Sequence, residues 1–204
     1  QFIQVELEQA RIFLEEYLNF GGYPQIITSK TVDEKVAVIK EIYSSYLNRD
    51  IRALLQIERS DAYTKMISLL SAQLGKILHY SNLASQTGLA TETLKKYLYY
   101  AEQTCAIKLI TPFFRNKVKE ITKSPEVYFN DIGLRNYAID EFGSITEPDE
   151  FSFVFENLVF DLLREINKDS SKTIHFWRTA DKAEVDFVID SGKEVLPVEV
   201  NFSE

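Results

Sequence analysis

The chain has 204 residues, 45% of them hydrophobic and 13% aromatic, which is the composition of a globular protein and not of a disordered one. Its length allows one large or two small domains, and no apolar run reaches the roughly 18 to 20 residues of a membrane span. The single cysteine, Cys105, excludes an internal disulfide, and with His79 and His175 as the only histidines a Cys/His zinc site is excluded too. No secretory signal is present, so we expect a cytoplasmic protein.

The net charge of −8 hides an uneven distribution along the chain. Residues 1–59 carry 7 basic and 9 acidic side chains, residues 60–124 carry 9 and 4, and residues 125–204 carry 7 and 18. The three segments therefore have net charges of −2, +5 and −11. The overall acidity argues against nucleic-acid binding by the whole surface, whereas the basic middle segment leaves it open there.

The first segment is predicted to be helical. A helix over residues 5–20 should stop at Gly21-Gly22-Tyr23-Pro24, and a second helix should start at a capping box formed by Thr31 and Glu34. The chain contains no G-x-x-x-x-G-K-[ST] phosphate loop. Because the sequence begins with Gln1 in place of Met, we expect it to be part of a longer protein.

The middle segment has the pattern of a winged helix. A helix over residues 62–78 is followed by a short helix from Ser81 to Gly88, a tight turn, a helix over 92–103 capped by Thr91, and a strand over 107–110. Leu94, Leu98 and Ala101 should face inward. The residues that should then face outward, towards DNA, are Lys95, Lys96 and Tyr99 on the second helix and Arg115, Lys117 and Lys119 in the wing.

The last segment carries the candidate catalytic residues. Three short runs rich in β-branched and aromatic residues, around 175–178, 184–190 and 195–201, predict consecutive strands. Period-two alternation places Asp186 and Glu199 opposite the apolar side chains of their strands, so two carboxylates meet if the strands pair. Paired carboxylates are typical ligands of Mg²⁺. The sequence therefore predicts Asp186 and Glu199 as metal ligands.

A third carboxylate lies on the long helix predicted over residues 151–166. Its buried face should comprise Phe151, Val154, Phe155, Leu158, Val159, Leu162, Leu163 and Ile166, with Phe153, Glu156 and Phe160 forming a second stripe beside it. A carboxylate between two phenylalanines costs free energy unless it is paired or metal-bound. Glu156 is therefore either a third acid of the site or a residue at the solvent edge of the helix.

A helix with Glu156, a strand with Asp186 and a strand with Glu199-Val200-Asn201 together resemble the PD-(D/E)XK nuclease superfamily, which has the restriction-endonuclease-like fold. The resemblance implies that Asp186 and Glu199 hold Mg²⁺, which activates a water for phosphodiester cleavage. It also implies a catalytic lysine where this chain has Asn201. A neutral asparagine cannot supply that positive charge, so the resemblance leaves catalysis in doubt.

A second resemblance covers nearly the whole chain. The chain is similar to the uncharacterised C-terminal region of prokaryotic AAA-type ATPases, and the matching blocks, in order, are Leu18-x-x-Gly21-Gly22-Tyr23-Pro24, Tyr46-Leu47-x-Arg49-Asp50-Ile51, Lys96-Tyr97-Leu98, Pro112-Phe113, Val127-Tyr128-Phe129-x-Asp131-x-Gly133-Leu134, Phe155-Glu156-Asn157-x-Val159-Phe160, Phe176-Trp177-Arg178 and Glu184-Val185-Asp186-Phe187-Val188-Ile189. This resemblance implies an ATPase domain, with the ATP site, in a segment before residue 1, and further strands or helices after Glu204.

Together these patterns predict an α+β protein with three parts: a helical connector at 1–59, a winged helix at 60–124 and a truncated nuclease-like domain at 125–204. The expected function is that of a DNA-associated module of an AAA-type ATPase, whose nuclease-like site (Glu156, Asp186, Glu199, Asn201) is weak or inactive. The alternatives are an active Mg²⁺-dependent DNA nuclease and a protein-interaction platform without nucleic-acid contact. The acidic last segment favours the platform unless a metal neutralises it, because carboxylates repel phosphate. Self-association stays open.

Overall fold

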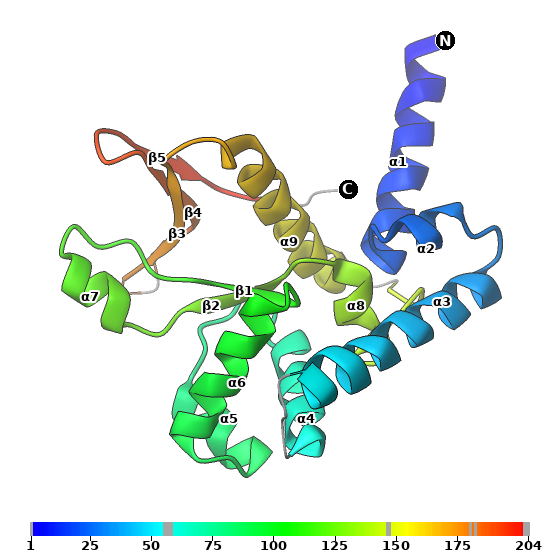
Figure 1. Cartoon of the computed structure of the whole chain (residues 1–204). Coiled ribbons are helices and arrows are strands. Elements are labelled where there is room, and N and C mark those ends of the chain that lie inside the picture. Colours follow the sequence, from blue (N-terminus) through cyan, green and yellow to red (C-terminus); the bar gives the residue numbers. More distant parts are fainter. Residues whose placement is uncertain (1, 55–58, 146–147, 180, 182, 202–204) are drawn as a thin grey trace. The chain divides into compact units, whose positions relative to one another are not determined.

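The computed structural model describes residues 2–54, 59–145, 148–179, 181 and 183–201 (Figure 1). The fold is mixed α+β, mainly helical with small antiparallel sheets, as the sequence predicts. Among the described residues, no helix is both long and apolar enough to cross a membrane. The chain divides into two compact units: unit 1 comprises Gln1–Ala72 and Asp131–Val154, and unit 2 comprises Gln73–Asn130 and Phe155–Glu204. The units interleave along the chain, and the predicted three-part division stays a prediction.

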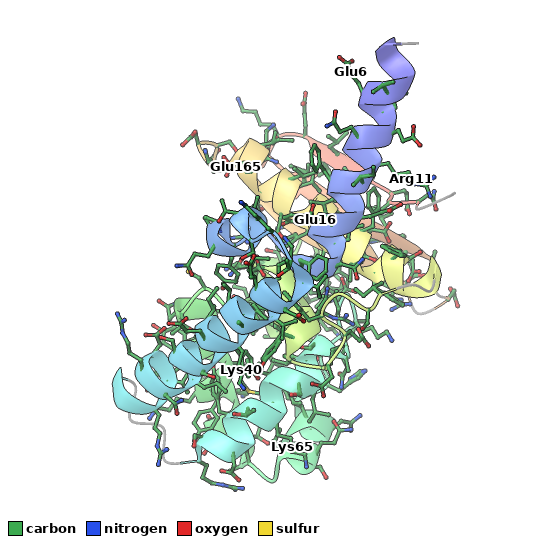
Figure 2. The ribbon with its side chains drawn as sticks, turned by 90° about the vertical axis from the view of Figure 1, so that its right-hand side faces the viewer. Glu6, Arg11, Glu16, Lys40, Lys65 and Glu165 are labelled. Carbon is green, nitrogen blue, oxygen red and sulfur yellow. The ribbon has the colours of Figure 1, made fainter. Side chains whose placement is uncertain are left out.

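Unit 1 is built from helices. Its elements are α1 (Phe2–Phe20), α2 (Pro24–Thr28), α3 (Val32–Ser45), the π-helix η1 (Tyr46–Leu54), α4 (Ser60–Ser71), α8 (Ile132–Tyr137) and the first turns of α9 (Pro148–Asn167). In Figure 2 the side chains of Glu6 and Arg11 project outward from α1. Lys40 on α3 and Lys65 on α4 are likewise exposed in the same view. The helices of unit 1 pack against one another through the faces opposite these exposed side chains.

A buried lysine joins the first three helices of unit 1. The predicted capping box is present, because Thr31 accepts from the backbone N–H of Glu34 and the Glu34 carboxylate accepts from that of Thr31. One residue on, the Lys35 ammonium donates to the carbonyl of Ile26 at 2.8 Å and pairs with Glu16 of α1 at 2.8 Å. Lys35 is only 5% exposed, so these partners compensate for removing its charge from water.

The Gly21-Gly22 stop is fixed by a residue more than a hundred positions away. Asp131 caps α8 by accepting from the N–H of Leu134 at 2.9 Å, and it also accepts from the N–H of Gly22 at 2.8 Å. Burial raises the pKa of the Asp131 carboxyl, while these backbone donors act in the opposite direction. Gly133 is required here, because a Cβ on it would lie 2.1 Å from the carbonyl oxygen of Phe20. The contact packs α8 closely against the end of α1.

Unit 2 begins with α5 (Tyr80–Thr87) and α6 (Thr91–Gln103), followed by β1 (Ile107–Ile110), α7 (Lys117–Thr122) and β2 (Glu126–Phe129). Strands β1 and β2 pair antiparallel with Ile107 opposite Phe129, and Ile77 forms an isolated bridge to Glu126. Figure 1 shows α7 within the connection between these two strands. The unit continues through α9 into a second antiparallel sheet.

That sheet has the order β3-β4-β5, from β3 (Thr173–Arg178), β4 (Glu184–Asp190) and β5 (Val195–Val198). Its core is an aromatic cluster: Tyr128 lies 4.5 Å from Phe160 of α9 and 5.5 Å from Phe187 of β4, measured between ring centroids. Ile110 and Phe176 complete the buried cluster. The alternation in β4 therefore directs Phe187 inward, as the sequence predicts.

Several local predictions are wrong. The helix predicted over 62–78 ends at Ser71, and His79 and Ala90, in place of Ser81 and Thr91, precede α5 and α6 without a side-chain cap. The segment that was predicted to be a wing contains a helix, α7.

The buried face of α9 is also displaced from the predicted one. Val154, Asn157 and Phe160 are buried, whereas Leu162 and Ile166 are 52% and 77% exposed. The buried face therefore combines Val154 of the predicted face with Asn157 and with Phe160 of the second stripe, whereas Phe153 of that stripe is 40% exposed.

We expect Gly133→Ala to lower the free energy of unfolding by about 3 kcal/mol, because the added methyl overlaps the Phe20 carbonyl and forces α1 and α8 apart. Urea denaturation measures the change. Gly192→Ala is the control: Gly192 has a φ of +81° but nothing within 4 Å of an added Cβ, so only the backbone cost of about 1 kcal/mol should appear. Equal losses at the two positions would contradict the steric explanation.

Candidate functional site

The first candidate surface is the α5–α6 pair. Helix α5 ends at Gly88, whose φ of 67° is left-handed, and the N–H of Leu89 bonds back to the carbonyl of Ala84 at 3.1 Å. Three residues then separate α5 from α6. On α6 the residues Leu94, Leu98 and Ala101 are buried, as predicted. The turn and the apolar face together fix which side of α6 remains at the surface.

That outer side carries the three predicted residues Lys95, Lys96 and Tyr99. All are exposed, Tyr99 at 57%. The Lys95 ammonium lies 3.6 Å from Glu92, an exposed pair that contributes little to stability, and the Lys96 ammonium lies 5.6 Å above the Tyr100 ring. Both ammonium groups can therefore turn towards an anionic partner.

The second group of predicted basic residues lies around α7. Arg115, Lys117 and Lys119 are exposed, as predicted for a wing. Lys117, however, donates to Glu120 at 2.9 Å and lies 3.8 Å from Asp190 of β4. The hydrogen bond with Glu120 raises the pKa of the Lys117 ammonium. Because acids on two sides already pair with it, Lys117 offers less charge to a ligand than its neighbours do.

The structure brings the predicted carboxylates Asp186 and Glu199 together. Phe187 pairs with Val198, so the residues before and after them in this antiparallel register lie side by side. Asp186 accepts from the N–H of Val200 at 2.7 Å. The pKa of the Glu199 carboxyl is raised by partial desolvation and by the charge of Asp186. Glu199 and Asn201 lie after the last residue of β5, in an extended segment at the surface.

Glu156 points into the same part of unit 2 from α9. The hydroxyl of Tyr128 donates to its Oε1 at 2.7 Å. Burial raises the pKa of Glu156 to about 7, opposed by this hydrogen bond and reinforced by the charge of Asp186. Gly75 makes room for the carboxylate, since a Cβ on it would lie 3.0 Å from Oε1. Glu156 is therefore not a residue of the solvent edge.

A further acid of this cluster, Glu126, was not identified in the sequence. It is the first residue of β2 and is 7% exposed, and its Oε2 lies 3.4 Å from the Tyr128 hydroxyl. Burial raises its pKa to about 8, and the charge of Glu156 adds to the increase. The one feature of the sequence that could have identified Glu126 is its position in the otherwise apolar strand Glu126-Val-Tyr-Phe. Such a strand is expected to be buried on both of its faces.

Two carboxylates of this cluster already accept hydrogen bonds within the protein. Within the described ranges, no group of three or more His, Cys, Asp or Glu side chains is arranged to hold a metal ion. Asp186 and Glu199 meet, but one oxygen of Asp186 already accepts from the Val200 N–H and Glu156 is bonded to Tyr128. Asp186 and Glu199, the two ligands predicted from the sequence, lie side by side, whereas Glu156 is not grouped with them as a third ligand in this conformation.

We expect Glu126→Gln to stabilise the protein at high pH. The pKa of Glu126 is about 8 in the folded protein and 4.5 ordinarily. The contribution of the protonated carboxyl to the free energy of unfolding is therefore fully present below about pH 4.5. It is lost as the pH rises through about 8. Glutamine stays neutral and keeps an oxygen in place. The variant should therefore gain about 2 kcal/mol over the wild type at pH 8.5 and show a much smaller difference at pH 5, in urea titrations.

The control for this experiment is Glu165→Gln, at an exposed glutamate of the same unit, which should change stability by less than about 0.5 kcal/mol at either pH. A difference between Glu126→Gln and wild type that is the same at pH 5 and pH 8.5 would show that Glu126 does not titrate abnormally.

The chain is similar to three proteins that are described as uncharacterized. It is 23% identical over 172 residues to an uncharacterized protein of Mycobacterium tuberculosis and to one of Mycobacterium bovis, covering 83% of this chain and 38% of each relative. An uncharacterized protein of Methanocaldococcus jannaschii is 26% identical over 204 residues, covering 97% of the chain and 44% of that relative. The chain thus spans less than half the length of these relatives.

No solved structure gives a significant match. Two family descriptions match the chain. A domain of unknown function (DUF4143) matches residues 151–204, which include Glu156, Asp186 and Glu199. Another domain of unknown function (DUF8612) matches residues 12–144, well over half of the sequence. The chain therefore belongs to the DUF8612 family.

Proposed function

We propose that this chain is the C-terminal module of an AAA-type ATPase and that it contacts duplex DNA through α6. The main support for DNA contact is the amphipathic character of α6. One face of the helix is buried, and the opposite face exposes Lys95, Lys96 and Tyr99. In a helix-turn-helix the second helix enters the major groove, where lysines contact phosphates and base edges. α6 is the second helix of the α5–α6 pair.

The order of elements supports this proposal. Helices α5 and α6 are followed by β1, an exposed connection and β2, and an isolated bridge joins Ile77 to Glu126 of β2. This is the order of elements in a winged helix. The net charge of +5 over residues 60–124 is the charge that a phosphate backbone attracts.

The ATPase part of the proposal rests on the ordered sequence blocks and on the family match. Segments described as DUF4143 are often found in the C-terminal regions of AAA-type ATPases, and such a segment covers residues 151–204. The curated relatives are more than twice as long as the region that they share with this chain, which leaves room for a nucleotide-binding domain. ATP binding and hydrolysis would then belong to that other part.

We further propose that the nuclease-like site is weak or inactive. Asn201 stands where the catalytic lysine is expected, and Glu156 accepts a hydrogen bond from the Tyr128 hydroxyl. The competing function, Mg²⁺-dependent cleavage of DNA, is favoured by the adjacency of Asp186 and Glu199. If these residues bind Mg²⁺, the ion would neutralise their repulsion of phosphate.

We expect the full chain to bind duplex DNA with a strong salt dependence, and we expect Lys95→Glu together with Lys96→Glu to weaken it at least tenfold. Each lysine that neutralises a phosphate contributes about 0.9 to the slope of log K against log salt, so the double variant should lower the slope by about 2. Fluorescence anisotropy of a labelled duplex at several salt concentrations measures both quantities.

The matched control is Lys168→Glu with Lys172→Glu, which reverses two exposed lysines of the same unit away from α6. It should keep most of the affinity. An equal loss in both variants would mean that only net charge matters, and no binding by the wild type would favour the protein-interaction platform.

We expect plasmid DNA incubated with the chain and Mg²⁺ or Mn²⁺ to be nicked no faster than with an Asp186→Ala variant, because the three carboxylates do not converge as ligands. Asp169→Ala, at an exposed aspartate of the same unit, controls for charge removal. Nicking that Asp186→Ala abolishes and Asp169→Ala preserves would establish the nuclease in place of the inactive site.

A further inference from the structure

The connection between β1 and β2 exposes two large apolar side chains. We call residues 115–123 the wing segment. Val118 and Ile121 of α7 are 72% and 75% exposed, and their spacing of three places them on one face of the helix. Exposed apolar residues are common singly, but two adjacent ones at the tip of a hairpin are not explained by the packing of unit 2.

The charges of the wing segment are one-sided. Arg115, Lys117, Lys119 and Lys123 are all exposed. The single acid, Glu120, has a side chain only 7% exposed and accepts from Lys117 at 2.9 Å and from the N–H of Phe114 at 3.5 Å. The outer surface of the segment therefore presents cations around an apolar pair, and its carboxylate is turned inward.

The apolar pair is held in place by local hydrogen bonds. Asn116 caps α7 by accepting from the N–H groups of Val118 and Lys119 at 3.0 and 3.3 Å. Thr122 donates to the carbonyl of Val118 at 2.8 Å, and Lys117 links the segment to Asp190. Because the helix is capped and anchored through Glu120, the outward direction of Val118 and Ile121 is part of the fold.

The combination identifies the kind of partner. An anionic partner suits the three cations Arg115, Lys119 and Lys123, and the apolar pair requires a surface that it can enter. A lipid surface is disfavoured, since interfacial helices bury a longer apolar face than the six residues of α7 provide. DNA suits both features: proteins that bind the minor groove set cations beside apolar wedges, which enter between base pairs and kink the duplex.

We propose that Val118 and Ile121 insert as a wedge between base pairs in the minor groove of duplex DNA and bend it, while Arg115, Lys119 and Lys123 contact the flanking phosphates. This inference rests on the proposed DNA contact by α6 and adds a second contact with a different task. Burying two branched apolar side chains is comparable in size to the cost of unstacking one base step, and the phosphate contacts of the flanking cations can offset the further cost of bending. The flexible TA step is the expected site of insertion.

The test uses the full chain and a duplex of about 30 base pairs with one central TA step and a dye at each end, so that bending raises energy transfer between the dyes. A second duplex carries 2-aminopurine at the central step, whose fluorescence rises when the base unstacks. Wild-type protein should raise both signals. Val118→Ser with Ile121→Ser should abolish both while weakening binding by less than about tenfold, because the phosphate contacts remain.

The matched control is Leu162→Ser with Ile166→Ser, which removes the exposed apolar pair of α9 in the same unit. It should bend DNA as the wild type does. The wedge is overturned if the wild type binds without changing either signal, or if the Val118/Ile121 variant still bends the duplex. Failure of the wild type to bind any duplex overturns the proposed function as well, and so is distinguishable from binding without bending.

Sedimentation with vesicles of phosphatidylcholine and phosphatidylserine provides the last arm. Vesicle binding that depends on Val118 and Ile121, with no bending of DNA, would assign the wing segment to a membrane surface and overturn the proposal. Absence of vesicle binding, together with a bend that depends on the same pair, would support it.

Discussion

Unit 2 depends on the complete burial of the four-residue strand β2. Both backbone groups of Phe129 are bonded by one side chain, since Asn157 of α9 accepts from its N–H at 2.8 Å and donates to its carbonyl at 2.9 Å. This amide replaces a neighbouring strand and locks α9 to β2 in one register. The adjacent Tyr128 ring then packs on Phe160 and Phe187, which joins both sheets to one core. Strand β2 also connects to both the wing segment, which leads into it, and the carboxylate cluster, where the Tyr128 hydroxyl donates to Glu156.

The sequence predicted the elements well where a residue's local pattern matches its final environment. The Thr31 capping box, the glycine stop at Gly88, the buried face of α6 and the pairing of Asp186 with Glu199 all depend on short-range chemistry or period-two alternation, and all are present. Residues whose environment is set from far along the chain were mispredicted. Leu162 and Ile166 are as apolar as buried residues, but Asn157 takes the inner position because β2 needs its amide.

Glu126 could not be recognised for the same reason. Its position in a strand is readable, but its proximity to Glu156 and Tyr128 follows from the packing of α9 on β2, which spacing along the sequence does not encode. Likewise, the reach of Asp131 to Gly22 spans 109 residues. The sequence could therefore predict Glu156, Asp186 and Glu199 as candidates for the site, whereas the tertiary structure was needed to add Glu126 and to show the hydrogen-bond partners of each carboxylate.

The Tyr128 hydroxyl has one proton to donate and two carboxylates within reach, so Glu126 and Glu156 cannot both be stabilised by it as anions. The remaining repulsion must be removed by a proton or by a cation. The raised pKa values of about 8 and about 7 describe the protonated solution. A catalytic lysine or a bound Mg²⁺ would be the other solution, and Asn201 removes the lysine. Glu156, one of the carboxylates by which the cluster resembles a nuclease centre, is therefore partly protonated near neutral pH, and a protonated carboxyl is a weaker ligand for a divalent ion.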